Sequence, residues 1–252
     1  MRIADVAALV TGAASGLGGA TARALAAKGA TVFGLDLPQA IEKADVVDGI
    51  TYVAADVTNP EQVGAAVEQA GGADKPLRIA VNCAGIGTAG RVVSKKGPHD
   101  LDLYRKIIEV NLIGTFNVLR LAADAITKTD PIEDDARGVI VNTASIAAFD
   151  GQVGQVAYSS SKGGVVGLTL PAARDLAQFG IRVMTIAPGI VDTPMLAGVT
   201  EEFRATLSSG VPFPKRLATP AEYAQLVVDI AEHDYLNGEV IRMDGALRMA
   251  PR

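Results

Sequence analysis

The sequence has little of the residue types on which several common chemistries depend. Its 252 residues include one cysteine, Cys83, and two histidines, His99 and His233. A single cysteine excludes an internal disulfide and favours a reducing compartment. We find no His/Cys/Asp cluster at metal-ligand spacing and no G-x-S-x-G motif, so we expect no metal site and no serine hydrolase.

A surplus of positive charge and long apolar runs are also absent. The formal net charge is −5, which disfavours a general nucleic-acid binder. No apolar run reaches the roughly 18 residues that a membrane span needs. The N-terminal stretch MRIADVAALVTG lacks the layout of a signal peptide. We therefore expect a cytoplasmic protein without nucleic-acid or membrane partners, the alternative being the mature form of an imported protein, which would look the same.

What the sequence does contain is a regular alternation of short apolar runs and longer helical patterns. Strands are predicted at 6–10, 31–36, 50–56, 78–85, 137–145, 181–189 and 237–245, and helices at 17–29, 60–72, 101–128, 156–179, 199–209 and 220–232. Repeated strand–helix–strand units predict an α/β fold, a doubly wound parallel sheet of about seven strands with helices on both faces. No linker divides the chain, so we predict a single domain over residues 1–252.

A glycine loop joins the first predicted strand to the first predicted helix in VTGAASGLGGA, residues 10–20. Glycines at positions 12, 16 and 18 permit a tight turn and let the backbone approach a pyrophosphate, which then faces free N–H groups of the helix. A glycine loop alone can also be only a turn. In this context it predicts a bound dinucleotide, with contacts at Gly12, Ser15, Gly16, Leu17 and Gly18.

Asp36 ends the second predicted strand and follows Gly18 by 18 residues. A carboxylate there can accept hydrogen bonds from both hydroxyls of an adenosine ribose, and it would repel a 2′-phosphate. No basic residue stands beside it or within residues 13–15. The pattern predicts NAD rather than NADP as the cofactor, the alternative being a solvated acid at a strand end.

Other groups end the third and fourth predicted strands, at the carboxyl edge where such sheets bind ligands. We expect Asp56 to hydrogen-bond adenine and Asn82 to brace the loop that follows it. Cys83 is expected to be a buried small hydrophobe rather than a catalytic thiol. The remaining cofactor contacts predicted here are Val57, Ala84 and Gly85.

Tyr158 and Lys162 lie four residues apart in AYSSSKGG and share one face of a predicted helix. A phenol normally has a pKa near 10, and an ammonium beside it, together with an oxidised nicotinamide, would lower that pKa. Tyr158 is therefore a candidate acid/base, and Lys162 is also a candidate to hold the nicotinamide ribose. Ser145 closes the fifth predicted strand and can donate to a substrate oxygen. Taken alone, the Tyr158–Lys162 pair could be purely structural.

These motifs together resemble the short-chain dehydrogenase/reductase family. The segments TGAASGLG, NCAG, YSSSK and PG, with Asn111 and Ser145, occur in that family's order and spacing over essentially the whole chain. The resemblance implies a Rossmann-like fold and hydride transfer between a nicotinamide and a hydroxyl or carbonyl carbon. It implies Tyr158 as acid/base, Ser145 polarising the carbonyl, Lys162 lowering the pKa of Tyr158, and Asn111 supporting a water-linked proton relay.

The same resemblance divides the chain into a cofactor-binding half, residues 1–90, and a catalytic half, residues 91–252. It implies a mobile substrate lid over about 190–215. The nicotinamide side would be shaped by Pro188, Gly189 and Thr193, with Thr193 bonding the carboxamide.

Longer segments, among them VPFPKRL, PAEYAQLV and LNGEVIRMDGALRM, resemble one branch of the family, the 3-hydroxyacyl-CoA and 17β-hydroxysteroid dehydrogenases. Members of that branch use NAD to oxidise short and branched 3-hydroxyacyl-CoA thioesters and some steroid alcohols, and they form homotetramers. The resemblance implies a role in fatty-acid or branched-chain amino-acid breakdown. The alternatives are that the substrate is another secondary alcohol, or that the chain is a non-catalytic NAD-binding protein.

Four polar residues carry weaker hypotheses. Gln152 and Gln155 lie between Ser145 and Tyr158, and either line the substrate site or cap the loop and helix there. The adjacent cations Lys95 and Lys96, in the polar connection 87–102, either contact CoA phosphates or are solvated. Subunit contacts are expected through the helices at 101–128 and 156–179 and through the C-terminal stretch VIRMDGALRMAPR.

Overall fold

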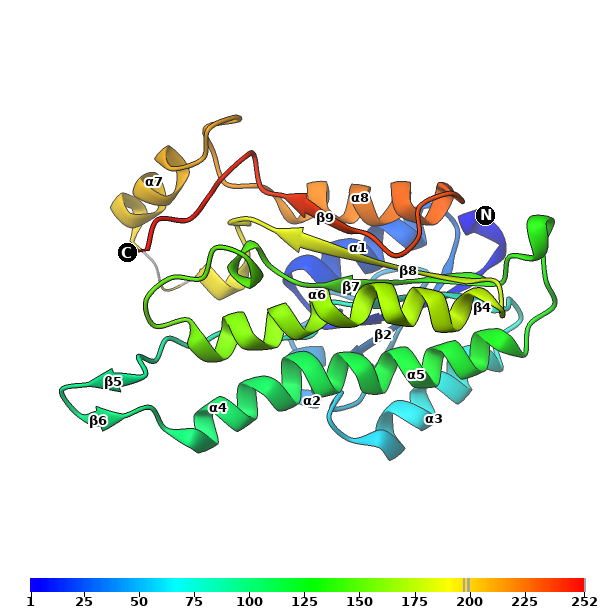
Figure 1. The fold of residues 1–252 in the computed structure, drawn as a ribbon. Coiled ribbons are helices and arrows are strands. Elements are labelled where there is room, and N and C mark those ends of the chain that lie inside the picture. The colour runs from blue at the N-terminus through cyan, green and yellow to red at the C-terminus, as the bar shows by residue number, and fades with distance from the viewer. Residues whose placement is uncertain (197, 199, 252) are drawn as a thin grey trace.

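The computed structural model describes residues 1–196, 198 and 200–251, and a seven-stranded parallel sheet lies at its centre (Figure 1). The strand order is β3-β2-β1-β4-β7-β8-β9, so the chain winds outward in both directions from β1 and β4. The strands are β1 (Ala7–Thr11), β2 (Thr31–Asp36), β3 (Ile50–Ala54), β4 (Leu77–Asn82), β7 (Gly138–Thr143), β8 (Ile181–Pro188) and β9 (Val240–Met243). The predicted doubly wound α/β fold is confirmed.

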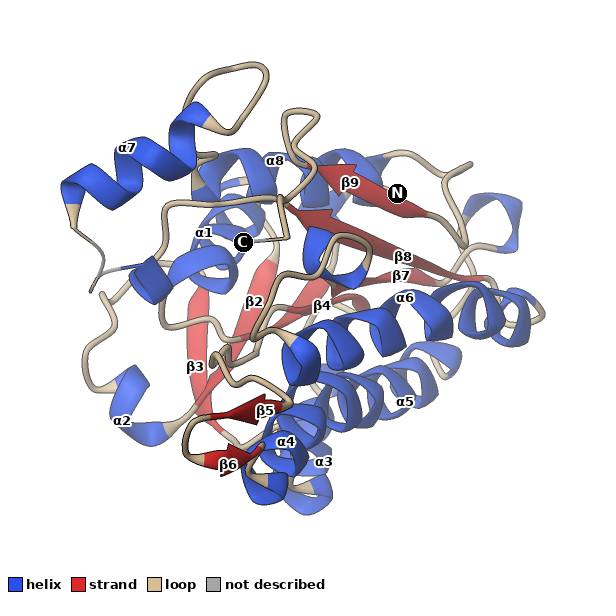
Figure 2. Ribbon diagram, turned by 60° about the vertical axis from the view of Figure 1, so that its left-hand side comes forward, coloured by secondary structure: helices blue, strands red, loops and turns tan. Residues whose placement is uncertain are grey.

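Helices cover both faces of this sheet. Helices α3, α5 and α6 lie on one face, and α1 and α8 lie on the other (Figures 1 and 2). The helices are α1 (Gly16–Ala27), α2 (Pro38–Ile41), α3 (Pro60–Gly71), α4 (Leu101–Ile108), α5 (Gly114–Thr127), α6 (Val156–Ala177), α7 (Glu201–Ser209) and α8 (Pro220–Glu232). In the part of the chain that the structure describes, none of the helices has the length and apolar character of a membrane span.

The apolar strands build one core on each side of the sheet. Successive side chains of a strand point to opposite faces, so Leu9 packs with Val118 under α5, while its neighbour Val10 packs with Leu25 of α1. Strands covered on both faces need apolar residues at nearly every position, which is why these runs are continuous. The two cores hold the carboxyl ends of the strands in one row.

The predicted helix over 101–128 differs in one respect from the observed one. A π-helical turn, Glu109–Ile113, joins α4 to α5. The wider turn interrupts the regular hydrogen-bond ladder of the helix, and the hydroxyl of Thr115 donates to the carbonyl of Asn111 at 2.8 Å. The widened turn carries the buried residue Asn111.

Two more differences lie at the carboxyl edge. The fourth predicted strand stops at Asn82, because the N–H groups of Cys83 and Ala84 leave the ladder and donate to the hydroxyl of Thr11. The polar connection 87–102 holds a small hairpin, β5 (Val93–Ser94) and β6 (Gly97–Pro98), which projects beside α4 (Figure 2).

Candidate active site

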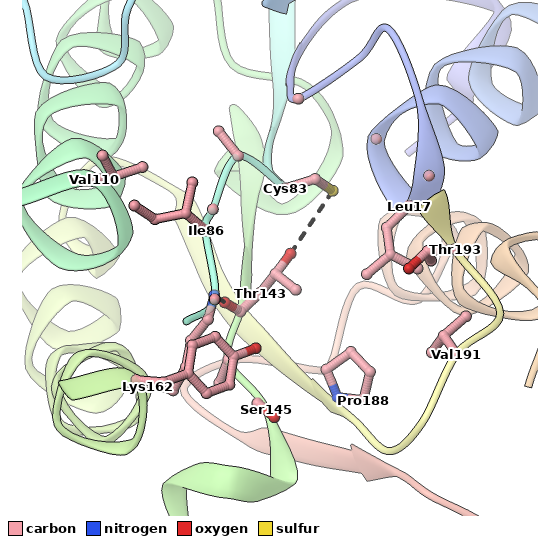
Figure 3. A pocket seen from close by; sticks show the side chains of 18 of the residues that line it. Leu17, Cys83, Ile86, Val110, Thr143, Ser145, Lys162, Pro188, Val191 and Thr193 are labelled. Atoms are coloured by element: carbon pink, nitrogen blue, oxygen red, sulfur yellow. Dashed lines mark hydrogen bonds between the residues drawn. The ribbon is translucent and has the colours of Figure 1, made fainter. Parts of the chain in front are cut away.

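A cavity of about 700 Å³ runs along the carboxyl edge of the sheet (Figure 3). Its walls come from segments that follow β1, β2, β3, β4, β7 and β8 and from the start of α6. One end holds the glycine loop and the ends of β2 and β3, and the other holds the start of α6 and the segment after β8. The lining includes the predicted residues Gly12, Ser15, Gly16, Leu17, Gly18, Asp36, Asp56, Val57, Ala84, Gly85, Ser145, Gln155, Tyr158, Lys162, Pro188, Gly189 and Thr193.

The backbone of the glycine loop is packed too closely for side chains at two of its glycines. Gly12 has a φ of +66°, and a Cβ there would lie 3.0 Å from the backbone nitrogen of Ala84. A Cβ on Gly18 would lie 2.2 Å from the carbonyl oxygen of Gly12. Helix α1 begins at Gly16 with no side-chain cap from Ser15 and no acid in its first turn. Its positive N-terminus therefore faces the cavity uncompensated, which fits a bound pyrophosphate.

The Asp36 carboxylate is joined to this loop. One oxygen accepts the N–H of Ala14 at 2.9 Å and the other accepts the N–H of Leu37 at 2.8 Å. Lys106 and Lys162 are the only lysine or arginine side chains among the described residues that line the cavity. Lys106 acts on Asp56, Lys162 lies farther along the wall, and no arginine lines the described cavity. The acid at this end therefore fits a ribose with free hydroxyls better than a phosphorylated one.

Asp56 marks the next strand end. Burial raises the pKa of its carboxyl, but hydrogen bonds from the N–H and hydroxyl of Thr58, together with the charge of Lys106, outweigh burial and lower that pKa. The carboxylate is thus stabilised as an anion at the cavity wall. It can accept a hydrogen bond from an adenine amino group, as the sequence predicts.

Tyr158, Ser145 and Lys162 meet at the other end of the cavity. The hydroxyl of Ser145 accepts the N–H of Ala147 at 3.1 Å and lies near the Tyr158 phenol. Burial raises the pKa of Tyr158, and the Ser145 hydroxyl acts against that rise. The expected lowering of this pKa by Lys162 is not seen.

The reason lies in where the Lys162 ammonium sits. Its nitrogen is 5.8 Å from the centroid of the Tyr158 ring and donates instead to the carbonyl oxygen of Thr143 at 2.8 Å. The side chain is buried, and this burial lowers the pKa of Lys162 to about 8. The lysine therefore retains a proton at neutral pH beside the face of the phenol.

Asn111 lies behind the cavity wall rather than in it. Its side-chain oxygen accepts the N–H of Ile86 at 2.8 Å, and its amide nitrogen donates to the carbonyl of Ile86 at 2.8 Å and to the hydroxyl of Ser161 at 3.0 Å. A Cβ added to Gly85 would lie 3.2 Å from the Asn111 oxygen. The π-helical turn thus fixes the loop after β4 against α6. Its predicted part in a proton relay stays a prediction.

Some predicted residues are placed elsewhere. The amide of Asn82 donates to Asn142 on the neighbouring strand at 2.9 Å, outside the cavity lining, so it ties β4 to β7. The amide of Gln152 donates to the carbonyl of Ala250 at 2.8 Å, while Gln155 does line the cavity. Lys95 and Lys96 form the exposed tip of the β5–β6 hairpin.

The segment after β8 occupies the position expected for the lid. Ile190, Val191 and Leu196 line the cavity, and Arg204 of α7 forms an ion pair with Asp192. Positions 197 and 199 of the expected lid lie outside the described residues. The apolar side chains of this segment give the far end of the cavity a wall suited to a carbon chain or a ring system.

Several lining residues were missed by the sequence reasoning. Thr143 stands two residues before Ser145, and its place at a strand end was a usable signal. Ile86 and Val110 line the cavity because the π-helical turn and the loop after β4 meet there. Met249 reaches the cavity from the C-terminal segment, for which the sequence gave no local signal. No group of three or more His, Cys, Asp or Glu side chains among the described residues could hold a metal ion.

Comparison with known proteins adds independent evidence. The family model for short chain dehydrogenase matches residues 6–203. The human and fruit fly (Drosophila melanogaster) proteins named 3-hydroxyacyl-CoA dehydrogenase type-2 are 52% and 51% identical to this chain. The human alignment covers 97% of this chain and 95% of the relative, and the fly alignment covers 99% and 100%.

Solved structures agree. The crystal structure of 3-hydroxyacyl-CoA dehydrogenase type-2 from Mycobacterium avium superimposes with a TM-score of 0.92 at 43% identity, over 98% of both chains. A putative gluconate dehydrogenase from Agrobacterium tumefaciens reaches a TM-score of 0.86 at 28% identity, over 99% of this chain and 98% of that one. The fold therefore extends to relatives whose names indicate unlike substrates.

Proposed function

This chain belongs to the short-chain dehydrogenase family and is an oxidoreductase, and from that premise we propose that it oxidises a 3-hydroxyacyl-CoA to the 3-oxo product with NAD. One observation carries the proposal: a single cavity joins the glycine loop and Asp36 to Ser145, Tyr158 and Lys162. Dinucleotide-binding groups and proton-transferring groups thus share one space. A binding protein without activity would need only the first set.

We assign cofactor contacts along the cavity from one end to the other. The open N–H groups of α1 hold the pyrophosphate, Asp36 holds the adenosine ribose, and Asp56 and Val57 lie at the adenine. Thr193 and the segment Pro188–Gly189 lie at the nicotinamide end. When bound there, NAD supplies the acceptor for a hydride. The absence of an arginine from the lining among the described residues favours NAD over NADP.

The reacting groups then have separate tasks. The phenol oxygen of Tyr158, once ionised, takes the proton of the substrate hydroxyl. The hydroxyl of Ser145 accepts the N–H of Ala147, and its single proton, which faces the Tyr158 phenol here, can be donated to the substrate oxygen when substrate binds. In the working enzyme the charge of Lys162, held at Thr143, would act together with an oxidised nicotinamide to stabilise the phenolate, against the burial that raises the Tyr158 pKa in this structure. Desolvation strengthens these effects, because charges interact more strongly away from water.

The substrate class rests on the relatives and on the far wall of the cavity. Relatives at about half identity are named for 3-hydroxyacyl-CoA. The wall of Ile146, Ile190, Val191, Leu196 and Met249 suits a short or branched acyl chain. A hydroxysteroid is the second candidate, because the same apolar wall also suits a ring system.

The test is a panel of substrates. NADH formation is measured from 3-hydroxybutyryl-CoA, 2-methyl-3-hydroxybutyryl-CoA and estradiol, each with NAD and with NADP. We expect the thioesters with NAD to give the largest kcat/KM. If estradiol alone were oxidised, the substrate would be a hydroxysteroid and not an acyl-CoA. If the protein did not bind NADH, the proposed function would be wrong.

A CoA contact at the hairpin tip is a separate part of the proposal. Lys95 and Lys96 are exposed cations in a protein of negative net charge, which suits a phosphate contact. Replacing both with alanine should raise KM for the CoA thioester and leave a CoA-free alcohol unaffected. Equal effects on the two substrates would contradict the contact.

We further propose that the chain works as a homotetramer in the cytoplasm. The long helices expose apolar side chains, including Ile113 and Phe116 on the π turn and α5, and Leu170 on α6, which favour burial between subunits. Light scattering on the purified protein measures the assembly, and cell fractionation measures the compartment. We also treat residues 1–252 as one domain, because strands from both halves share one sheet.

A further inference from the structure

Among the residues that the structure describes, Tyr223 is the largest side chain that is completely buried, and its hydroxyl bonds a residue of the cavity wall. It belongs to α8, and its ring packs with Val141, Ile186 and Val227 between the helix and the sheet. The phenol oxygen is 2.7 Å from the hydroxyl of Thr143. Tyr223 does not line the cavity, so it does not contact a ligand there.

The direction of this hydrogen bond follows from the other contacts of Thr143. The Thr143 hydroxyl donates to the carbonyl oxygen of Asn82 at 2.5 Å. A hydroxyl has a single proton, so Tyr223 must donate to Thr143. Burial raises the pKa of Tyr223 well above 10, which keeps that donor protonated. The chain of bonds thus runs from Tyr223 through Thr143 to the end of β4.

Thr143 is also the anchor of the lysine. Its carbonyl oxygen is the one acceptor found for the Lys162 ammonium among the described residues. The pairing of β4 with β7 ends at Asn82 and Asn142, one residue before Thr143. Beyond that point the side chain of Thr143 provides its link to β4, next to Cys83 (Figure 3). On the other side, the N–H of Ala144, in the same peptide unit as the Thr143 carbonyl, donates to Ile186 of β8 at 2.8 Å. The hydroxyl bonds of Thr143 therefore supply the second tether of this carbonyl, on the side of β4.

We propose that Tyr223 is a positioning residue that fixes the Lys162 ammonium of the active site through the hydroxyl of Thr143. The inference rests on the proposed function, in which Lys162 supports the phenolate of Tyr158. The titratable groups near this ammonium are the Tyr158 phenol on α6, the Cys83 thiol at the end of β4, and Tyr223 itself on α8. Burial raises the pKa of Cys83, so no anion there replaces the Thr143 carbonyl.

Tyr223→Phe separates the hydroxyl from the packing of the ring. A less firmly held carbonyl stabilises the ammonium less, so the pKa of Lys162 falls further below its usual value. In apo protein labelled with 13C at the lysine ε carbon, the Lys162 resonance is the one missing from Lys162→Arg. We expect its titration midpoint in Tyr223→Phe to be lower than in the wild type by about 0.5 unit or more. This readout needs neither cofactor nor turnover.

Kinetics supply the second measurement. We expect kcat of Tyr223→Phe to fall about five- to tenfold, with KM for NAD changed less than about twofold. The alkaline limb of the pH profile moves to lower pH with the lysine. Thr143→Val should lower both the Lys162 titration midpoint and kcat, while Thr143→Ser, which keeps the hydroxyl, should have wild-type values. The double variant Tyr223→Phe/Thr143→Val should have the same midpoint and kcat as Thr143→Val alone.

A matched control exists in the same fold. Thr169 donates to the carbonyl of Val165 at 2.8 Å, so the hydroxyl of Thr185, 2.7 Å away, donates to Thr169. Thr185→Val removes the first donor of this buried series of hydrogen bonds, which does not include Lys162. It should lower the free energy of unfolding and leave the titration midpoint of Lys162 unchanged. The proposal would be overturned if Tyr223→Phe had the titration midpoint and kcat of the wild type. It would also be overturned if the loss of kcat in the double variant equalled the product of the losses in the two single variants. A shifted midpoint in a protein without dehydrogenase activity would uphold the positioning and reject the proposed function.

Discussion

The carboxylate of Asp36 accepts the backbone N–H of Ala14 at 2.9 Å, so the acid that ends β2 is attached to the glycine loop that ends β1. The two parts that recognise a dinucleotide are therefore set in place together. A change at Asp36 acts on the position of the loop as well as on charge at the ribose.

Asp36→Asn tests cofactor choice. The amide keeps an acceptor for the N–H of Ala14 but removes the negative charge that would repel a 2′-phosphate. We expect the preference for NAD over NADP, as a ratio of kcat/KM values, to fall by about 10- to 100-fold, the range for hydrogen bonds to a charged group. Initial rates with both cofactors measure it. Asp48→Asn, an exposed acid outside the cavity, should leave the ratio as it was.

Tyr158→Phe tests the proton transfer. Without the phenol oxygen nothing at this position can take the substrate proton, and we expect turnover to fall by about 10²- to 10⁴-fold. Binding of NADH, followed by its fluorescence, should change little because the ring still fills the space. Tyr235→Phe, at a side chain that is almost fully exposed, is the control. Wild-type turnover in Tyr158→Phe would mean that another group carries the proton.

Lys162 should make stability depend on pH above neutrality. Burial lowers its pKa from 10.5 to about 8. Below pH 8 the lysine is charged in both the folded and unfolded states, and the folded state bears the full cost of burying the charge. Above pH 10.5 it is neutral in both. Between these values the unfolded chain binds more protons, so the folded state gains about 3 kcal/mol as pH rises.

Comparison with Lys162→Met isolates this contribution. The difference in unfolding free energy between the wild type and Lys162→Met should change by about 3 kcal/mol in favour of the wild type between pH 8 and pH 10.5. Urea unfolding at several pH values gives these energies. Lys95→Met, which removes an exposed lysine, should show a constant difference. A constant difference for Lys162→Met as well would mean that its pKa is not lowered.

Gly18→Ala should impair NADH binding, whereas Gly64→Ala should stabilise the fold. A Cβ at Gly18 would lie 2.2 Å from the carbonyl of Gly12, so the loop must move and affinity for NADH should fall at least about tenfold. A Cβ at Gly64, inside α3, meets nothing within 4 Å, and alanine there should stabilise the fold by about 0.5–1 kcal/mol. NADH titration and thermal unfolding measure the two effects. Unchanged NADH affinity in Gly18→Ala would mean that the glycine loop does not bind the cofactor.

Arg242 secures the segment that brings Met249 to the cavity. Its guanidinium bonds Asp150, Asp244 at 2.7 Å and the carbonyl of Leu247 at 3.0 Å. Asp150→Asn should lower the free energy of unfolding by about 1–3 kcal/mol and raise KM for the acyl substrate more than it lowers kcat.

The pH dependence of that ion pair follows from the lowered pKa of Asp150, which the Arg242 hydrogen bond causes. Its contribution is present in full above the ordinary aspartate pKa and is lost as the pH falls through the lowered value. Urea midpoints at neutral and acid pH measure this loss. Arg105→Met, which breaks an exposed ion pair with Asp102, should have almost no effect.

The order of strands and helices could be predicted because each element carries its own local signal. Continuous apolar runs give the strands, and Pro60 and Gly72 bound α3 at its two ends. The π-helical turn at Asn111 could not be predicted, since one extra residue in a helix leaves the apolar pattern on either side readable as one helix. The hairpin β5–β6 was missed because its strands have two residues each, too few for a pattern.

The residues of the candidate site likewise fall into those that local motifs predict and those that depend on contacts distant in sequence. Asp36, Ser145 and Tyr158 follow from short motifs whose spacing fixes their place at the sheet edge. Gln152 was a candidate either for the substrate site or for a cap of the loop and helix, and its bond to Ala250, distant in sequence, has no local signature. The lowered pKa of Tyr158 was inferred from the i,i+4 spacing, whereas Lys162 is drawn to the carbonyl of Thr143, a partner that depends on how α6 packs against β7.

The cavity of the candidate site lies at one end of the sheet, and at the other end Arg78 donates to the carbonyls of Asp130 and Arg137. That end is the natural place for engineering. A tether, a reporter or an inserted peptide at the exposed turn 132–135 would point away from the cavity. The enzyme should therefore accept immobilisation there at undiminished turnover, while the same attachment at the hairpin tip should disturb the proposed CoA contact.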